Sequence, residues 1–591
     1  MPTQWNERPG KHPAVAGAVL VLVTSAVFAS SLANGFVYDD VPQILQNPFI
    51  LNPRLWSQIF TGNVWSFQGS HTNFYRPLPF FTYWLLYRLA GANPGVFHLF
   101  QLLLYAATVW LVFRLGRELF QNELAAFLGA LLWAVHPLHV EAVAWISALA
   151  DAGFGFFYLL AFWLFLRAEK ASQGRAFAHG LATLAYLPAL FSKEMALSFP
   201  LLLLAYWLFI PSQESWLTRA ACWIPYVGAA AVYTIIRLHL LGYLTIAGGL
   251  WKVSLNVVSA GVGLLGEHTR LFFWPTHLSQ FRTFELGPSL WSPWPWLTLV
   301  ALAVAFGLRK REPVLAFLVI WWPVALIPCL DIRQLSIPVL ADRFSYLPSV
   351  GPCLAISFFF IVRLPERVLS MKFLRLAPAV LATVMIFWAV LTIRAIPHWS
   401  DTETLASYSL QQSPNAPTPH IVRALYLQYQ SGDIEAAVRE YETALQLNRA
   451  SLRPLADISY DCYLGLGQIA YVKGQTEEAI GYFERAIRLH PTRPAAYHFL
   501  GSVFFPRGDY TKAAESFAQA VRMNPYDLTG RFYLGTCWMK LGKYRAAAEQ
   551  FRAAREVDPT YWEAYEAEAR ALEAAGDSAG ATRVRTLLRS P

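Results

Sequence analysis

The chain has 591 residues, of which 55% are hydrophobic and 14% are charged, and its mean hydropathy is +0.36. Soluble globular proteins contain about 25% charged residues, so this composition excludes a wholly soluble chain and indicates a membrane protein. The formal net charge of +9 comes from short basic clusters between apolar runs. This distribution is typical of membrane topology signals, and no nucleic-acid partner is expected.

Apolar runs dominate the first 400 residues, and a helix needs about 17–25 apolar residues to cross a bilayer. Candidate spans lie near 14–33, 96–116, 152–168, 196–210, 222–240, 293–308, 313–330, 346–363 and 376–396, with shorter candidates near 123–136, 178–192 and 254–275. About eleven or twelve spans are therefore predicted. The first run is long for a cleaved signal peptide, which favours an uncleaved anchor.

Basic residues between the runs predict the orientation of the spans, because Lys and Arg are enriched in cytoplasmic loops. Placing every basic cluster inside makes the spans alternate correctly, except that residues 241–292 must begin and end outside. The run 254–275 is therefore predicted to be re-entrant, interfacial or a short hairpin. In this topology the N-terminus is cytoplasmic. Everything after residue 396 lies on the outer face, periplasmic or lumenal.

A repeat of 34 residues occupies the end of the chain. This interval separates equivalent glycines, alanines, aromatic residues and prolines, namely Gly467, Gly501 and Gly535; Ala479, Ala513 and Ala547; Phe483, Phe517 and Phe551; and Pro491, Pro525 and Pro559. The period and the residue pattern are the signature of tetratricopeptide repeats. A degraded copy at 418–450 and a truncated one at 560–591 flank the clean copies. Stacked helix pairs form a concave surface, so the array is predicted to bind a protein.

The predicted fold class is thus all-α, with a polytopic membrane domain over residues 1–400 and a tetratricopeptide-repeat superhelix over residues 401–591. The five cysteines are scattered and contain no CxxC pair. Neither a disulfide framework nor a zinc site is predicted from them.

Most of the unusual polar residues of the membrane domain fall in segments predicted to lie outside. They are Asp39, Asp40, Arg76, His136, His139, Glu141, Asp151, Lys193, Glu194, Arg282, Asp342 and Arg343. Ionisable residues at membrane depth are costly and usually have a function. Their convergence on one side therefore favours an enzyme or a transporter over a purely structural protein.

Two of these groups have structural alternatives. Asp39 and Asp40 cannot face the same way, so one can enter a cavity while the other braces the loop, and the alternative is a solvated turn. His136 and His139 would share a helix face, which is compatible with a metal site. Their spacing matches no HExxH-type pattern, so hydrogen-bonded packing at a helix end is favoured.

The cationic residues also allow two interpretations. Lys193 and Glu194 either form a neighbouring ion pair or present Lys193 to an anionic phosphate. Asp342 and Arg343 either anchor the chain at the interface or offer the donor fork of Arg343 to a phosphate. Arg76 and Arg282 are further cationic candidates on the same side.

Five stretches occur in a characteristic order: "GFVYDDVPQILQNP", "YRPLPFFTYWLLYRLAGANPGVFHLFQLLLYA", "LLWAVHPLHVEAVAWISALAD", "LFSKEMA" and "ADRFSYLPSVG". Followed by the repeats, they resemble the transmembrane and tetratricopeptide-repeat O-mannosyltransferases and their prokaryotic relatives, which have the GT-C glycosyltransferase fold. The resemblance covers nearly the whole chain. Its specificity comes from the ordered set rather than from a single motif.

The resemblance implies an inverting glycosyltransferase that moves a sugar from a polyprenyl-phosphate-linked donor in the membrane to a hydroxyl acceptor, most simply a protein Ser or Thr, on the non-cytoplasmic face. Asp39 or Asp40 is expected to be the catalytic base. Lys193, Arg343 and Arg76 are expected to bind the donor phosphate, and the supporting residues are His136, His139, Glu141, Asp151, Glu194 and Asp342. No metal or other cofactor is expected. The repeats are expected to bind the acceptor protein or glycan.

Relatives of this family usually carry a basic residue about two positions before the acid that matches Asp151. This chain has only Ser147, Ala148, Leu149 and Ala150 there. One charge contact expected from the resemblance is therefore missing from this segment.

Three other functions remain open from the sequence. A non-catalytic, membrane-anchored repeat scaffold for envelope assembly explains the repeats but not the convergence of charged residues. A ligase or polymerase of lipid-linked glycans shares the topology and the donor and differs only in its acceptor. A transporter is disfavoured because the spans show no internal duplication.

Overall fold

The computed structural model describes residues 13–212, 214–242, 255–282, 286–330, 340–367, 371–451 and 454–589. Every regular element within these residues is a helix, which confirms the all-α prediction. The chain divides into two compact units. The first comprises Met1–Val37, Asn73–Pro79 and Ala90–Asp401, and the second comprises Tyr38–Thr72, Phe80–Leu89 and Thr402–Pro591. A division at residue 400 alone does not anticipate the two early segments of the second unit.

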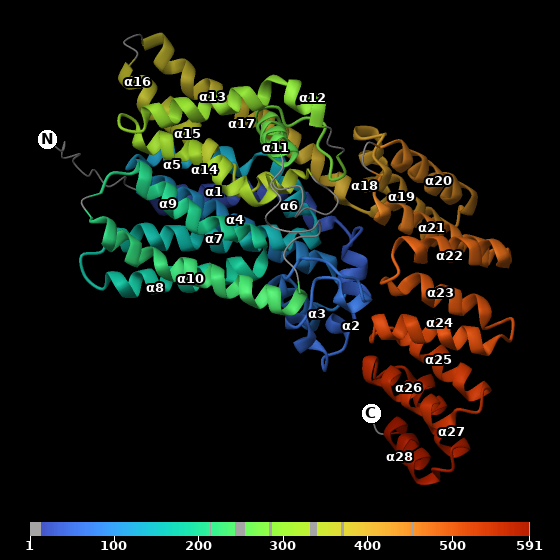
Figure 1. The fold of residues 1–591 in the computed structure, drawn as a ribbon. Helices are drawn as coiled ribbons and strands as arrows, with labels where there is room; N and C mark the ends of the chain where they lie inside the picture. Colours follow the sequence, from blue (N-terminus) through green and yellow to red (C-terminus); the bar gives the residue numbers. More distant parts are fainter. Residues whose placement is uncertain are drawn as a thin grey trace. The chain divides into compact units, whose positions relative to one another are not determined.

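The first unit is a bundle of apolar helices (Figure 1). Its α-helices are α1 (Pro13–Phe28), α4 (Pro94–Phe120), α5 (Glu123–Ala134), α6 (Val140–Ala144), α7 (Leu149–Glu169), α8 (Arg175–Ser192), α9 (Phe199–Phe209), α10 (Trp216–Leu241), α11 (Leu255–Phe273), α12 (Leu286–Trp291), α13 (Pro293–Leu308), α14 (Pro313–Leu330), α15 (Val350–Phe358), α16 (Leu364–Arg367) and α17 (Met371–Ala395). Short helical turns link several of them, including η5 (Pro137–His139), η7 (Glu194–Ser198) and η8 (Asp342–Ser345).

Six helical segments of the described chain are long and apolar enough to cross a membrane, or seven if a bent helix pair counts as one span. They are Ala14–Ala33, Pro94–Phe120, Ile146–Glu169, Trp216–Leu241, Pro313–Leu330 and Pro378–Trp399, and the bent pair is Glu123–Ala134 with Pro137–Ala144. Large apolar side chains such as Leu22, Leu103 and Ile386 are exposed on these segments, as expected for surfaces that face lipid. The chain is thus an integral membrane protein.

The number of long spans is lower than the eleven or twelve expected from the apolar runs. Several of those runs fold as shorter apolar helices, Glu194–Phe209, Pro293–Leu308 and Val350–Arg363. At about 1.5 Å per residue, helices of 10–17 residues fall short of the roughly 30 Å hydrocarbon core. The run expected at 254–275 forms α11, which carries Glu267 and Arg270 and is not among the six long spans.

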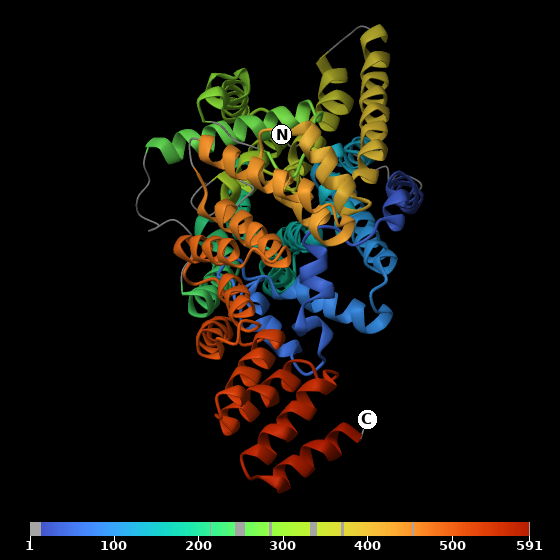
Figure 2. The same ribbon diagram turned by 90° about the vertical axis from the view of Figure 1, so that its right-hand side faces the viewer.

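The second unit contains the repeat array, a stack of antiparallel helix pairs (Figures 1 and 2). Its α-helices are α2 (Pro48–Leu51), most of α3 (Pro77–Ala90), α18 (Thr402–Gln412), α19 (Pro417–Tyr426), α20 (Ile434–Ala450), α21 (Ala456–Val472), α22 (Thr476–Leu489), α23 (Pro494–Phe504), α24 (Tyr510–Met523), α25 (Leu528–Lys540), α26 (Tyr544–Val557), α27 (Trp562–Ala574) and α28 (Ser578–Arg589). The degraded copy corresponds to α19 and α20, and the truncated one to α27 and α28.

The repeated glycines allow the two helices of each repeat to approach closely. A Cβ atom added at Gly501 would lie 2.9 Å from the ring of Phe517, which is fully buried in the following helix. Gly467 and Gly535 meet the equivalent phenylalanines in the same way. The 34-residue period of the sequence therefore corresponds to a packing contact that recurs in each clean copy, between a glycine of one helix and a phenylalanine ring of the next.

Residues 38–72, which follow the first apolar helix, pack against the repeats. The ring of Phe49 meets the ring of Tyr526 edge-on, with centroids 4.7 Å apart. The hydroxyl of Tyr526 donates a hydrogen bond to Oε1 of Gln58 at 3.0 Å. One tyrosine at a turn between repeats thus holds two parts of the loop.

Further along the array, Asn52 holds the loop through the repeat backbone. Its Nδ2 donates hydrogen bonds to the carbonyl oxygens of Glu556 and Val557, at 3.0 and 2.8 Å. Gly69 has φ +68°, and a Cβ atom there would lie 2.7 Å from the carbonyl oxygen of Met523. Glycine is therefore needed at this contact, both for its left-handed backbone and for the close approach.

We expect Gly501→Ala to destabilise the repeats by about 1–3 kcal/mol, because the added methyl group must displace the Phe517 ring. The matched control is Gly481→Ala in α22, where a Cβ atom meets nothing within 4 Å. That change should stabilise by about 0.4–1 kcal/mol. Thermal unfolding of the full chain, monitored by proteolytic cleavage within residues 402–591, measures both effects. Equal effects of the two changes would contradict the packing role.

We expect Asn52→Ala to loosen residues 38–72, because it leaves two repeat carbonyls without their donor, at a cost of about 1–3 kcal/mol. Hydrogen exchange of the loop amides should accelerate, while exchange within α25 and α26 changes little. Asn415→Ala, at an exposed position, is the control. Unchanged exchange in the loop would show that Asn52 does not hold it.

Candidate functional site

Buried charged side chains gather in the first unit, where α7 begins and α8 ends. Asp151 lies in the first turn of α7, and Lys193 directly follows α8. Their side chains are 4% and 2% exposed, and Nζ of Lys193 donates to Oδ1 of Asp151 at 2.5 Å. The start of a helix favours a carboxylate because the helix dipole is positive there. The sequence therefore places the acid at the end of α7 that tolerates it best.

A second ion pair joins η8 to α6. Both carboxylate oxygens of Glu141 accept from Arg343, one from its backbone N–H at 2.9 Å and the other from Nη1. Nε of Arg343 also lies 3.9 Å from Oδ2 of Asp151, which links this pair to the first. The guanidinium carbon lies 5.3 Å from the ring of Trp145 and 5.2 Å from that of Phe344. Aromatic faces and carboxylates thus fix the orientation of Arg343.

A third ion pair is bidentate. Nε and Nη2 of Arg76 donate to the two oxygens of Glu194, at 2.9 and 2.5 Å. The guanidinium also lies 4.4 Å from the centre of the Phe74 ring. Glu194 follows Lys193 directly in the chain, so consecutive residues take part in the third and the first ion pair.

Two further arginines surround these pairs. Nη2 of Arg282 lies 3.0 Å from Oδ1 of the buried Asp342. Nε and Nη2 of Arg237 both donate to the carbonyl oxygen of Asn73, at 2.9 and 2.5 Å. Neither contact is suggested by the sequence, in which the partners lie far apart.

Burial dominates the electrostatics outside the spans. Burial lowers the pKa of Lys193, and the neighbouring Asp151 carboxylate opposes this effect. Burial raises the pKa of Asp342, and Arg282 opposes it. In both cases an oppositely charged partner favours the ionised form against desolvation.

The cations differ in their access to solvent. The side chains of Arg76 and Arg343 are 19% and 14% exposed, whereas Lys193 is enclosed at 2%. Among the residues that the structure describes, no protein atom accepts a hydrogen bond from Nη2 of Arg343. The two arginines are therefore the cations of this group best able to meet a ligand. Lys193 mainly neutralises Asp151.

His136 and His139 lie in the interior of the first unit. His136 caps η5 by accepting from the Leu138 N–H, and its Nε2 lies 3.1 Å from the carbonyl oxygen of Phe272. The two ring nitrogens of His139 lie 3.0 Å from the hydroxyl of Tyr105 and 2.9 Å from that of Ser349. Both histidines therefore make the hydrogen-bonded packing that the sequence favoured over metal binding.

Asp39 and Asp40 belong to the second unit, whereas the nine other predicted site residues belong to the first. Asp40 is buried and Asp39 is half-buried, at the start of the short turn Val41–Leu45. Tyr38, immediately before them, has φ +53°. The left-handed region costs a residue other than glycine about 1–2 kcal/mol. The backbone that presents the two acids is therefore strained.

Several features of the site are absent from the sequence analysis. These are the left-handed Tyr38, the role of Arg237, and the aromatic walls from Trp145 and Phe344. Arg237 lies near the end of the predicted span 222–240, and nothing in the sequence indicates its partner. Asp151 lacks a nearby basic residue in its own segment, but Lys193 and Arg343 supply the charge from other elements.

The two halves of the chain match different known protein families. Residues 71–241 match the family Dolichyl-phosphate-mannose-protein mannosyltransferase. Residues 423–494, 464–527 and 504–574 match tetratricopeptide repeat families. The first match contains the ion pairs of Lys193 and Arg76 together with Glu141. It begins after Asp39 and Asp40 and ends before Arg343.

The curated relatives that the chain matches are protein O-mannosyl-transferases. The chain is 35% identical over 196 residues to Protein O-mannosyl-transferase TMTC1 of Homo sapiens, covering 32% of this chain and 22% of that protein. It is 34% identical over 146 residues to Protein O-mannosyl-transferase TMTC2 of Mus musculus, covering 24% and 17%. With Protein O-mannosyl-transferase Tmtc1 of Drosophila melanogaster it shares 32% identity over 177 residues, covering 29% and 20%. The matches span about a fifth of the length of these relatives.

Solved structures match a smaller part of the chain. MamA covers 29% of this chain and 88% of its own, with 22% identity and a TM-score of 0.25. YrrB, described as a TPR protein with an unusual peptide-binding site, covers 31% and 89%, with 24% identity and a TM-score of 0.26. The family and relative matches confirm the resemblance inferred from the sequence: a membrane half similar to protein O-mannosyltransferases is followed by tetratricopeptide repeats.

Proposed function

We propose that the protein is an inverting membrane glycosyltransferase of GT-C type. It moves a sugar from a polyprenyl-phosphate-linked donor to a hydroxyl acceptor, most simply a protein Ser or Thr, on the non-cytoplasmic face. The observation that carries this proposal is the cluster of three ion pairs, the buried Asp151–Lys193 and the partly buried Glu141–Arg343 and Glu194–Arg76. Five of these six residues lie within the stretch that matches the mannosyltransferase family.

The charge of the cluster suits a phosphate. Its cations are Arg76, Lys193, Arg237, Arg282 and Arg343, and its carboxylates are Glu141, Asp151, Glu194 and Asp342. Cations therefore exceed carboxylates by one among the described residues. Glu141 and Glu194 occupy only part of the donor forks of Arg343 and Arg76, and the remaining N–H groups can meet phosphate oxygens. The carboxylates hold the two forks in place before the donor arrives, so binding requires little reorganisation.

The reaction needs a base and a stabilised leaving group. The acceptor oxygen attacks the anomeric carbon, and the bond from that carbon to the phosphate oxygen breaks with inversion. The electron pair leaves on the polyprenyl phosphate, whose added negative charge Arg343 and Arg76 stabilise. The hydroxyl proton passes to an aspartate, because a hydroxyl is poorly nucleophilic until a positioned base removes it.

Of the two candidate bases, Asp39 is the more accessible, and we assign the proton transfer to it. The buried Asp40 braces the loop, and the strained Tyr38 fixes the direction in which both acids point. The repeats bind the acceptor. Because they also hold residues 38–72 through Tyr526 and Asn52, acceptor binding and the base are attached to the same unit.

We expect Asp39→Asn to reduce the rate of sugar transfer by about 10²–10⁴-fold, the usual contribution of a general base. Single-turnover transfer by purified protein in lipid, with a panel of polyprenyl-phosphate sugars, measures it. Asp40→Asn tests the alternative assignment, and Asp401→Asn, an exposed acid that also follows a membrane helix, is the control. Unchanged turnover in both loop variants would refute the role of these acids. No turnover of any donor by the native protein would favour a non-catalytic scaffold.

We expect Arg343→Lys to weaken kcat/KM for the donor by about 10–100-fold, because lysine keeps the charge but loses the fork, at about 1.5–3 kcal/mol. Initial rates over a range of donor concentrations measure this effect. Arg311→Lys, an exposed change on the loop after α13, is the control. A kcat/KM equal to that of the native protein would remove Arg343 from the phosphate site.

A further inference from the structure

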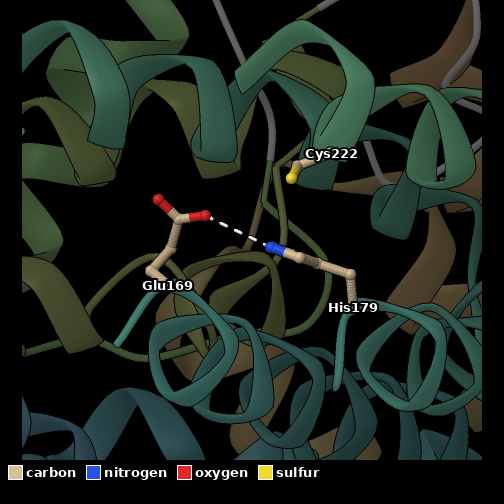
Figure 3. Close-up of side chains that lie close together, drawn as sticks. All are labelled: Glu169, His179 and Cys222. Carbon is tan, nitrogen blue, oxygen red and sulfur yellow. Dashed lines mark ion pairs between the residues drawn. The ribbon is translucent and has the colours of Figure 1, made fainter. Parts of the chain in front are cut away.

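Three side chains of different chemistry meet at the far end of α7. Glu169 is the last residue of α7, His179 lies in α8 and Cys222 in α10. One ligand atom of each, a carboxylate oxygen, a ring nitrogen and a sulfur, lies within 4.8 Å of the other two (Figure 3). At about 1.5 Å per residue, α7 separates this group from Asp151 by about 27 Å. The group is therefore distinct from the candidate transferase site.

The ring of His179 is held in the orientation that a metal ligand requires. Its Nδ1 lies 3.0 Å from the hydroxyl of Tyr226, and that hydroxyl can donate to the carbonyl oxygen of His179 at 3.5 Å. The hydroxyl then accepts from the Nδ1–H, which leaves the lone pair on Nε2. Metal-binding histidines are usually fixed in this way through the nitrogen that does not bind the metal.

Nε2 of His179 points into the group. The side chain is 3% exposed, and Nε2 is buried without a hydrogen-bond partner among the described residues. It lies 3.3 Å from Oε1 of Glu169, a contact that is attractive if Nε2 carries a proton or if a cation lies between the two atoms. Cys222 and Tyr226 are four residues apart in α10, so they share a helix face. One side of α10 thus supplies both the sulfur and the group that orients the histidine.

Glu169 is held in a similar way. The indole N–H of Trp207 donates to its Oε2 at 3.1 Å, which leaves Oε1 directed at His179. Arg175 donates to Oε1 at 2.9 Å and pairs on its other side with Glu214 at 2.6 Å. A carboxylate at the C-terminal end of a helix is disfavoured by the helix dipole, so Glu169 needs cations. A carboxylate oxygen has two lone pairs and can accept from Arg175 while it binds a metal.

We propose that Glu169, His179 and Cys222 form a binding site for a divalent cation of the zinc type. One nitrogen, one thiolate and one carboxylate are ligands that Zn²⁺ takes, and three protein ligands leave a fourth position for water. The bound ion joins α7, α8 and α10, in addition to the Arg175–Glu169 ion pair and the His179–Tyr226 hydrogen bond. On binding, the thiol releases its proton to solvent. The site does not depend on the proposed transferase activity.

The competing account is a network closed by protein atoms alone, in which Arg175 neutralises Glu169 and His179 donates to it. The two accounts differ in a direct measurement on the native protein. After chelation and removal of bound metal, the full chain in detergent is titrated with Zn²⁺ by calorimetry and with Co²⁺ by absorption spectroscopy. The proposal predicts one equivalent bound, with the intense thiolate-to-cobalt absorption of a sulfur ligand. Absence of binding, or of this absorption, would establish the protein-only network.

Variants locate the site. Cys222→Ser should abolish the thiolate-to-cobalt absorption, and Tyr226→Phe, a positioning change, should weaken Zn²⁺ binding by about 10–100-fold. Cys462→Ser in the repeats and His71→Gln at an exposed position are the controls. Binding that survives Cys222→Ser and is lost in a control variant would overturn the assignment. The Co²⁺ absorption spectrum of the native protein tests the proposal without any substitution. A variant that fails to fold therefore leaves the proposal open to refutation.

Discussion

The burial of charge inside an apolar bundle is the constraint on which the first unit depends. Lys193 and Asp151 are almost completely enclosed, and each would be intolerable there without the other. Breaking a buried pair by removing one partner typically costs about 3–5 kcal/mol. Segments far apart in the chain must therefore meet. They are α6, the start of α7, the end of α8, η8 and the loop segment before α3 that carries Arg76. The fold around this cluster follows from the need to neutralise it.

Such pairs are an expensive way to stabilise a protein, because well-packed apolar residues often do so equally well. Their concentration at one end of α7, with aromatic walls around Arg343, is better explained by a ligand than by stability. Fixed donors aimed at a developing negative charge are the usual means by which an enzyme stabilises a leaving group. A strained Tyr38 before two acids fits the same account, since strain persists where the surroundings hold the backbone in place.

The sequence predicted the features that depend on periodicity and composition. The 34-residue interval from Gly467 to Gly501 and Gly535 correctly predicted the repeats, because each glycine recurs where two helices must touch. The low content of charged residues also made the ionisable residues of the membrane domain stand out as candidates for a functional site. It did not predict the partners, since Glu141 and Arg343 are separated by 202 residues and no periodic signal joins them. The described residues contain fewer long spans than the eleven or twelve spans expected, because several apolar runs fold as helices of 10–17 residues.

Two further features required the three-dimensional arrangement. From the sequence, residues 38–72 were expected to be a loop of the membrane domain. Three-dimensional contacts, such as those of Phe49 and Asn52, group them with the repeats. Cys222 has no neighbouring cysteine, so cysteine spacing gave no reason to expect a metal site. Its partners come from other helices, which the sequence cannot bring together.

The most direct test of the account is a cryo-electron microscopy structure of the protein in lipid with bound polyprenyl phosphate, the leaving group of the proposed reaction. The account predicts phosphate density within hydrogen-bond distance of the Arg343 guanidinium and close to Arg76, with Asp151–Lys193 still paired behind it. Phosphate bound elsewhere, with the three ion pairs closed and unchanged, would contradict the assignment of this cluster as the donor site.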